Sequence, residues 1–360
     1  MGEPHPVFAA ARADNGPEVL RLLSLEPSLV SEREPTNNWT LLHLFARLSN
    51  ASMVSQLLAL GADCEARDAA FRSPLHHAAR ADMEASRLPS DSAPATSTTS
   101  DRAAAIVATL EALLKAGARV TARDQFGFTA LHHSAQAGHG STIEYLLGLS
   151  SGPLRVSRAP LEAESNAEER PLHVAAQGGH AATVQLLLKH GAHPCKTNYV
   201  GQTPLHLAVL GGDSPAALAT VRELCSHRWR VDVNAPTPAG TTPLHLAAEH
   251  GHTRCVRALL AAPSVGRHGG DRVVNLGARD CKGRTAYDLA LENQFEDTVE
   301  VLAAALQTGQ ATREEVEAAE EEILKKAMSD VRVSGRIPTI REGEAEGEAE
   351  ADAASMDDDE

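Results

Sequence analysis

Apolar stretches of five to ten residues alternate with polar, glycine-containing segments along most of the chain. In residues 240–260, GTTPLHLAAEHGHTRCVRALL, two apolar stretches flank Gly251. The second stretch places Val256, Leu259 and Leu260 at the spacing of one helical face. Gly251 is suited to end the first stretch, because glycine readily adopts the backbone conformation that terminates helices. The pattern predicts units of two short helices joined by a turn.

A Leu-His pair marks the same place in successive units. The spacings between its histidines are 33, 56, 41, 33 and 39 residues, so the repeat length is 33 with insertions of 23, 8 and 6 residues. Counting outward adds a degenerate unit around Ala10 and another around Asp288. A helix pair leaves an apolar face uncovered, so the units must stack on one another. The histidines are His43, His76, His132, His173, His206 and His245.

The Thr-Pro-Leu-His stretches GTTPLHLAAEHG and GQTPLHLAVLGG resemble the signature of the ankyrin-repeat family. The resemblance extends over roughly residues 6–308, and six copies in register make it specific. It implies an all-α solenoid of about eight helix-turn-helix units with β-hairpin fingers. The units are expected near residues 6–34, 35–68, 69–124, 125–165, 166–198, 199–237, 238–280 and 281–308.

Two segments depart from this pattern in composition. The insertion in the third unit, about residues 84–102, is rich in Ser, Thr, Pro and Ala, which predicts a disordered loop. Residues 312–331 begin with a capping box, Thr312 and Glu315, and are expected to form a C-terminal helix. Residues 332–360 are expected to be a disordered acidic tail. Residues 310–360 carry 17 acidic and 6 basic side chains, and so account for most of the net charge of −15.

The 17 histidines raise the question of a metal or catalytic site. The six repeat histidines occupy equivalent positions, and helices pack about 8–10 Å apart, whereas metal ligands lie about 2 Å from the ion. They are therefore expected to be structural, and the family resemblance implies that each imidazole bonds backbone near a turn. The additional histidines are expected to be solvated or capping, with a pH-sensing pair as the alternative. They are His77, His133, His139, His180, His250 and His252. No nucleophile elbow or phosphate-binding loop is found, so we expect neither an enzyme nor a cofactor.

Five cysteines without a CxxC pair indicate a reducing compartment. The first ten residues do not resemble a signal peptide, and no apolar run is long enough to cross a bilayer. The net negative charge and the lack of a basic, aromatic stripe argue against nucleic acid. We therefore expect a cytoplasmic and/or nuclear protein, monomeric on its own, with no membrane or nucleic-acid partner.

Aromatic and arginine side chains cluster at the expected finger turns of units 2 to 6. The family resemblance implies that partners bind along the finger turns and first helices, on the concave side. Side chains of these kinds are enriched where proteins bind one another, which favours a protein-binding edge there. Packing of Phe71 or Phe126 onto a neighbouring finger is the alternative. Arg67, Arg80 and Arg123 add positive charge nearby. The candidate residues are Trp39, Phe71, Arg72, Phe126, Phe128 and Tyr199.

These features favour an adaptor or scaffold that binds another protein. The alternative is an escort chaperone, in which the acidic tail helps to shield a basic client such as a ribosomal protein or a histone. The tail is expected either to compete for the arginine-bearing edge or to recruit the basic protein itself.

Overall fold

The computed structural model describes residues 5–81, 99–148, 160–226, 228–262 and 274–307. The chain divides into two compact units, 1–315 and 316–360, and all described residues belong to the first. The predicted C-terminal helix (312–331) and acidic tail (332–360) lie outside the described residues.

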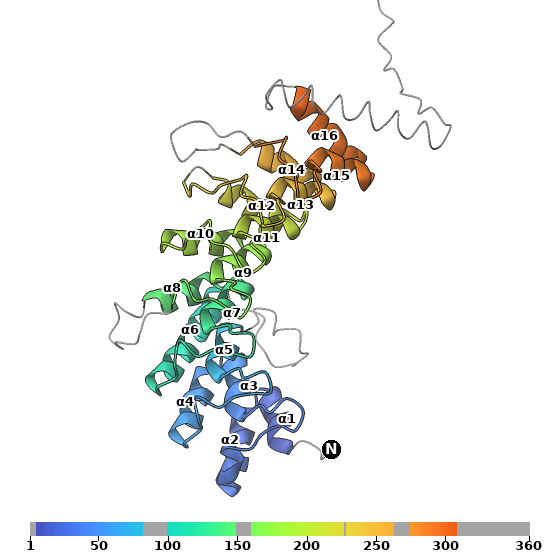
Figure 1. Ribbon diagram of the computed structural model, residues 1–360. Coiled ribbons are helices and arrows are strands. Elements are labelled where there is room, and N and C mark those ends of the chain that lie inside the picture. Colours follow the sequence, from blue (N-terminus) through green and yellow to red (C-terminus); the bar gives the residue numbers. More distant parts are fainter. Residues whose placement is uncertain (1–4, 82–98, 149–159, 227, 263–273, 308–360) are drawn as a thin grey trace, which may run out of the picture. The chain divides into compact units, whose positions relative to one another are not determined.

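The described residues form eight successive pairs of helices (Figure 1). In each pair, the first helix packs on the first helices of the neighbouring pairs, and from the second pair onwards the second helix packs on the neighbouring second helices. We call them inner and outer helices. The inner helices are α1 (Pro6–Arg12), α3 (Leu41–Arg47), α5 (Pro74–Ala79), α7 (Ala130–Ala137), α9 (Pro171–Gln177), α11 (Pro204–Leu210), α13 (Pro243–Glu249) and α15 (Ala286–Glu292). The outer helices are α2 (Gly16–Leu25), α4 (Ala51–Ala59), α6 (Thr99–Lys115), α8 (Gly140–Gly148), α10 (Ala181–Lys189), α12 (Pro215–Leu224), α14 (Thr253–Leu260) and α16 (Glu296–Gln307). A short 3-10 helix, η1 (Pro27–Val30), follows α2.

The core of the stack is a continuous layer of leucine, valine and alanine side chains. Leu75, Leu131 and Leu205 of the inner helices are fully buried, as are Leu110 and Ile143 of the outer helices. Alanines fill the inner-helix positions where two backbones approach closely. The burial explains why helices of six to ten residues, too short to be stable alone in water, form here.

Two expectations need correction. The predicted disordered insertion, about residues 84–102, is wrong at its C-terminal end, because α6 already begins at Thr99; residues 82–98 lie outside the described residues. The fingers predicted as β-hairpins are hydrogen-bonded turns, and none of the described residues forms a strand.

Candidate functional site

The finger turns share one hydrogen-bonded geometry. The first residue of each turn donates its N–H to the carbonyl four residues on, and the fourth residue donates back to the first, as in Asp68–Arg72 and Asp124–Phe128. The side-chain oxygen of the first residue also accepts two N–H groups, those of Ala70 and Arg72 in the case of Asp68. Short polar side chains are therefore required at this position. The finger turns are residues 68–72, 124–128, 165–169, 198–202, 237–241 and 280–284.

Successive finger turns are joined by backbone hydrogen bonds. Gln125 donates its N–H to the carbonyl of Ala70, and Asn166 donates to that of Phe126. An equivalent bond, from the second residue of one turn to the carbonyl of the third residue of the preceding turn, joins the other neighbouring turns, with one exception. Pro238 occupies the donor position of the fifth turn, 237–241, and proline has no N–H to give to the carbonyl of Val200. Its ring instead packs against Gly201, where an added Cβ would lie 2.2 Å from the Pro238 Cδ.

The repeat histidines join each inner helix to the finger turn of the next unit. In His132, Nδ1 accepts the N–H of Thr129 at 3.1 Å, and Nε2 lies 3.1 Å from the carbonyl oxygen of Glu169. Because Nδ1 accepts, Nε2 carries the proton and donates it to the carbonyl. The other five repeat histidines make the same two contacts.

Burial lowers the pKa of these histidines, because it disfavours the charged ring. The pKa falls to about 3 in His43 and His76 and to about 4 in His132, His173 and His206, and it is also lowered in His245. Neutral imidazoles that hold backbone groups in this way do not act as general acids or metal ligands.

Two further histidines lie beside the repeat histidines and contact finger-turn carboxylates. His77 Nε2 is 2.9 Å from Asp68 Oδ2, and His133 Nε2 is 3.0 Å from Asp124 Oδ2. Both rings are buried, so the expectation of solvated or capping side chains is wrong for this pair. Burial raises the pKa of Asp68, but the hydrogen bonds from His77 and Arg72 outweigh it and leave the pKa below its ordinary value. The sequence signal for these pairs was an Asp nine residues before a His in two consecutive units.

The candidate aromatic residues divide into two groups. Phe71, Phe126 and Tyr199 are 62%, 60% and 71% exposed. Trp39 and Phe128 are partly buried, and their rings pack on histidines of the inner helices. Trp39 meets the His77 ring at 4.7 Å between centroids, and Phe128 stacks on His132 at 5.0 Å.

Arginines that precede the finger turns donate hydrogen bonds to backbone carbonyls beside the next finger turn. Arg33 donates to the carbonyl of Arg67, Arg67 to that of Arg123, and Arg123 to that of Glu164. Each therefore joins its own turn to the next, a role that the sequence did not suggest. Arg72 forms an ion pair with Asp68 at 3.0 Å.

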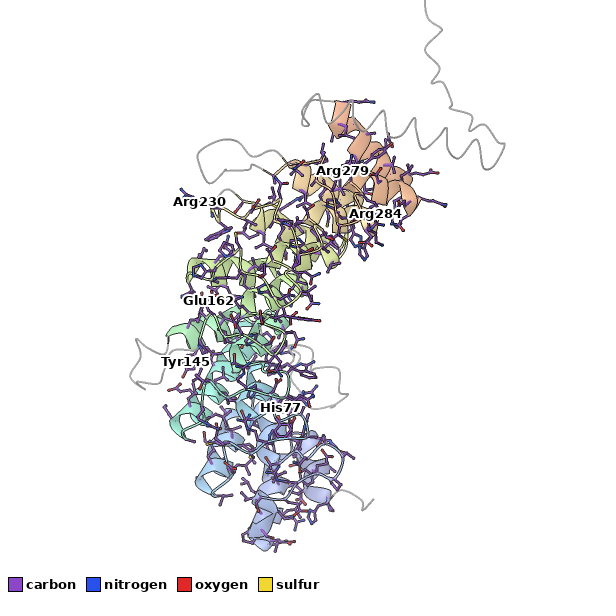
Figure 2. The ribbon with its side chains drawn as sticks, in the orientation of Figure 1. His77, Tyr145, Glu162, Arg230, Arg279 and Arg284 are labelled. Carbon is purple, nitrogen blue, oxygen red and sulfur yellow. The ribbon has the colours of Figure 1, made fainter. Side chains whose placement is uncertain are left out.

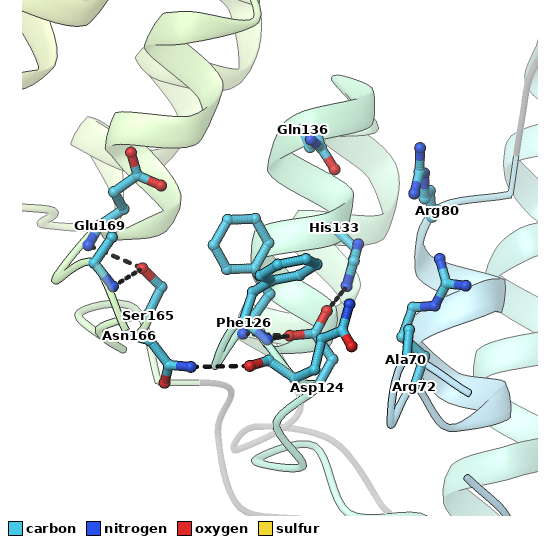
Figure 3. Close-up of a pocket in the computed structure, with 13 residues that line it drawn as sticks. Ala70, Arg72, Arg80, Asp124, Phe126, His133, Gln136, Ser165, Asn166 and Glu169 are labelled. Atoms are coloured by element: carbon cyan, nitrogen blue, oxygen red, sulfur yellow. Dashed lines mark hydrogen bonds and ion pairs between the residues drawn. The ribbon is translucent and has the colours of Figure 1, made fainter. Parts of the chain in front are cut away.

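A cavity of about 490 Å³ lies between the finger turns 68–72, 124–128 and 165–169 and the ends of α5 and α7 (Figure 3). It brings together Arg72, Phe126 and Phe128 of the candidate residues, and adds Arg80 and Gln136 from the inner helices. Trp39, Phe71 and Tyr199 do not line it. Its mixture of aromatic, cationic and amide side chains can bind an extended peptide but contains no nucleophile activated by a base.

Within the described ranges, no group of His, Cys, Asp and Glu side chains is arranged to hold a metal ion. The buried thiols of Cys225 and Cys255 are held protonated, since burial raises the pKa of each to about 12. No helix in the described part of the chain has the length and apolar character needed to cross a membrane.

Comparison with known proteins gives relatives that share the repeat. The chain is 29% identical to ankyrin repeat protein nuc-2 of Neurospora crassa over 259 residues, covering 70% of this chain and 20% of that protein. It is 32% identical to human B-cell lymphoma 3 protein over 105 residues, covering 29% of this chain and 20% of that protein. It is 33% identical to ankyrin repeat domain-containing protein 37 of Xenopus tropicalis, covering 29% of this chain and 54% of that protein. The chain thus spans between a fifth and about half of the length of these relatives.

Among solved structures, the ankyrin repeat domain of Bcl-3 superposes with a TM-score of 0.50 at 25% identity, covering 72% of this chain and 97% of that domain. A family model of ankyrin repeats in three copies matches residues 7–88, 102–198, 156–237 and 216–311. These matches take in most of the chain. The chain belongs to the ankyrin-repeat family.

Proposed function

We propose that this protein is an adaptor or scaffold that binds a partner protein along its finger turns and inner helices, without catalytic activity of its own. Ankyrin-repeat domains generally mediate protein–protein interaction. The observation that most supports binding along the finger turns is the cavity next to Phe126. An aromatic side chain that is 60% exposed beside a cavity loses much apolar surface when a partner covers it.

The proposed binding centre consists of Phe126, Phe128, Arg72 and Arg80. Phe126 supplies apolar surface, while Phe128 is held rigid by its stacking on His132. Rigid aromatic side chains lose little conformational entropy on binding. Arg72 and Arg80 place positive charge at one wall of the cavity, which favours a partner segment that carries carboxylates next to apolar side chains. Phe71, Trp39 and Tyr199 would extend the contact to neighbouring turns.

The test is a double substitution, Phe126→Ala and Phe128→Ala, in the full chain. Partners are captured from cell extract by affinity purification, and the affinity of each purified partner is then measured by calorimetry. We expect the double variant to lose about 1–4 kcal/mol of binding free energy, as for other aromatic anchors. The matched control is Leu25→Ala with Leu60→Ala, which removes exposed apolar side chains (71% and 54%) far from the cavity. An unchanged affinity with unchanged helicity by circular dichroism would contradict the proposal.

A second candidate function is that of an escort chaperone for a basic client. Its support is the charge of residues 310–360, which hold 17 acidic and 6 basic side chains. Deletion of residues 342–360 should abolish binding of a purified basic client such as a histone at low salt. If the tail instead competes for the arginine-bearing edge, the same deletion should strengthen binding of an acidic peptide there. Five cysteines without a CxxC pair support a reducing compartment, the cytoplasm or the nucleus, for either function.

A further inference from the structure

A tryptophan, an arginine and a histidine are in contact where units 2 and 3 meet. The ring of Trp39 meets the ring of His77, labelled in Figure 2, at 4.7 Å between centroids and an interplanar angle of 69°. The Arg47 guanidinium lies over the same tryptophan ring, 5.6 Å from its centroid. One aromatic side chain therefore contacts both an imidazole and a cation, and cations are attracted to the face of an indole.

The repeat places an equivalent group one unit further along the chain. The residues equivalent to Trp39, Arg47 and His77 are, in the same order, Arg72, Arg80 and His133. The two arginines follow after 33 residues, and the histidine after 56 because the third unit carries the 23-residue insertion. Arg80 and His133 both line the cavity between the finger turns. The cavity therefore contains the equivalents of both residues that contact the indole in the preceding group.

In this second group an arginine stands in the place of the tryptophan. The Arg72 guanidinium pairs with Asp68 at 3.0 Å, in its own finger turn. Figure 3 shows Arg72 and Arg80 on the same side of His133. Phe128 meets His133 at 5.9 Å, but it belongs to the same unit as this histidine and so is not equivalent to the tryptophan. Among the described residues, Arg80 contacts no aromatic ring. We call the part of the cavity next to Arg72, Arg80 and His133 the ring pocket.

His133 also has a hydrogen-bonding atom without a partner. Its Nε2 donates to Asp124 Oδ2 at 3.0 Å, because an ionised carboxylate can only accept. Nδ1 then carries a lone pair, and no described residue donates to it, although the side chain is only 5% exposed. Buried polar atoms are nearly always hydrogen-bonded, so this acceptor indicates a ligand with an N–H or O–H group.

The ring that fits the ring pocket has to come from another molecule. Every Phe, Trp and Tyr of the chain lies within the described ranges, so the remaining segments cannot supply one. The cavity of about 490 Å³ has room for an aromatic side chain and the backbone that carries it, since ligand pockets are about 300–1,000 Å³ in volume.

We propose that the ring pocket takes a tryptophan or tyrosine side chain of the partner protein, which lies against His133 and Arg80 as Trp39 lies against its own two neighbours. The proposal deepens the proposed function and rests on it. Tryptophan and tyrosine each have a donor for His133 Nδ1, whereas phenylalanine has none. Trp39 itself shows only that the place accepts an indole, since its Nε1 has no partner among the described residues.

The experiment uses the full chain and N-acetyltryptophanamide as the probe, followed by NMR of the imidazole nitrogens of His133. We expect saturable binding with a dissociation constant of about 0.1–1 mM, as for ligands of this size. The derivative methylated at the indole nitrogen should bind about twofold to tenfold more weakly, because it cannot donate to Nδ1. N-acetylleucinamide, which has no ring to place under Arg80, should bind more weakly than either.

Arg72→Trp tests the ring pocket from within the chain. The substitution repeats the residue at position 39, so its indole should fill the ring pocket and abolish binding of the probe, with helicity unchanged. The matched control is Arg284→Trp, which should leave binding unchanged. Arg284, labelled in Figure 2, holds the equivalent position in the last unit and forms the equivalent ion pair, with Asp280.

A second variant removes the acceptor and keeps the cavity. Asp124→Asn with His133→Leu repeats the pair Asn198 and Leu207, which hold the equivalent positions two units further along. Because that combination already occurs in the stack, the variant should fold. It should bind the probe and its methylated derivative equally, since the imidazole acceptor is gone.

Several results would overturn the proposal. These are absence of binding by the tryptophan probe, equal binding of the tryptophan and leucine probes, equal effects of Arg72→Trp and Arg284→Trp, or an unchanged preference over the methylated probe in the Asp124→Asn, His133→Leu variant. Self-association of the chain that Arg72→Trp abolishes would assign the ring to a second copy and not to a partner protein.

The ring pocket and the proposed function can fail separately. A captured partner whose affinity falls in the Phe126→Ala, Phe128→Ala variant but not in the Arg72→Trp variant would retain the protein-binding edge and remove the ring pocket. Probe binding that behaves as expected, while neither variant changes the affinity of any partner, would retain the ring pocket and remove the edge.

Discussion

Phe71 combines a strained backbone with an exposed ring. Its φ is 58°, at the turn position where Gly127, Gly201, Gly240 and Gly283 also have positive φ. A side chain in this region of φ costs about 1–2 kcal/mol relative to its preferred conformations, whereas glycine adopts it readily. The ring is 62% exposed and so contributes little buried surface in return. Strain of this kind without packing is often found at binding sites.

We therefore predict that Phe71→Gly raises the free energy of unfolding by about 0.5–1 kcal/mol and at the same time weakens binding of the partner. Urea denaturation and calorimetry measure the two effects. Glu168→Gly is the matched control, because Glu168 holds the same turn position with a φ of 56° and has no aromatic ring. It should stabilise the fold to a similar extent and leave binding unchanged. A Phe71→Gly variant that is less stable than the wild type would show that the ring packs on the fold after all.

The conformation of a single residue could be predicted where the repeat pattern gives that residue a defined place. Phe71 stands in the place of the turn glycine, and its backbone conformation agrees. The partners of His77 and His133 were not predicted, because each bonds a carboxylate in a turn nine residues earlier, and helical periodicity carries no information about that contact. The same holds for Arg33, Arg67 and Arg123, whose acceptors are backbone carbonyls of the following turn.

At the scale of elements, the finger turns form one hydrogen-bonded row with a gap between the turns 198–202 and 237–241. Proline at position 238 removes the donor, and Gly201 makes room for its ring. Stability in repeat proteins is close to a sum of terms between neighbours, so a missing bond weakens one interface in particular. The interface between the sixth and seventh units is therefore expected to open before those around it.

We predict that Pro238→Ala, which restores an N–H opposite the carbonyl of Val200, slows hydrogen exchange of the amides in α13 and α14 by about twofold to tenfold. A net hydrogen bond contributes about 0.5–1.5 kcal/mol, which sets this range. Native-state hydrogen exchange followed by mass spectrometry or NMR provides the measurement. Pro236→Ala is the control, because it has the same effect on the unfolded chain but lies outside the donor position. Equal exchange in both variants would mean that the gap does not weaken the interface.

The sequence predicted which segments form helices more accurately than the residues at which those helices begin and end. The helix pairs follow from apolar periodicity and from Thr or Ser caps. The start of α6 at Thr99 was placed too late, because Thr, Ser and Asp are common both in disordered loops and in the first turn of a helix. The fingers lack strands because each consists of a single tight turn, too short for a ladder between two extended segments.

At the scale of the whole molecule, the repeat histidines couple the stability of the stack to pH. Unfolded histidine has a pKa near 6.5, whereas the folded values are about 3 for His43 and His76 and about 4 for His132, His173 and His206. Between these limits the unfolded chain binds protons that the folded chain does not. The free energy of unfolding is therefore highest above pH 6.5 and falls as the pH decreases.

We predict a loss of about 1–2 kcal/mol per repeat histidine between pH 7 and pH 5, from a slope of about 1.4 kcal/mol per pH unit for each group. Five such groups acting together would bring the loss close to the whole stability of an ordinary domain, about 5–15 kcal/mol. Urea denaturation across this pH range is the measurement. A His132→Leu variant should be less stable at pH 7 and should have a shallower pH dependence. A stability that does not change between pH 7 and pH 5 would rule out the neutral, buried state of these rings.

Each repeat histidine finds one of its two backbone partners in its own unit and the other in the unit that follows. During synthesis on the ribosome, a newly completed unit therefore carries an imidazole whose carbonyl partner has not yet been made. Each of units 2 to 7, which carry the repeat histidines, therefore lacks one hydrogen bond until the next unit has been made. The last unit needs no successor, because Asp288 stands in place of histidine and bonds only Thr285 of its own helix cap, through the N–H and the hydroxyl at 2.8 Å. Once the eighth unit has been made, every repeat histidine therefore has its carbonyl partner.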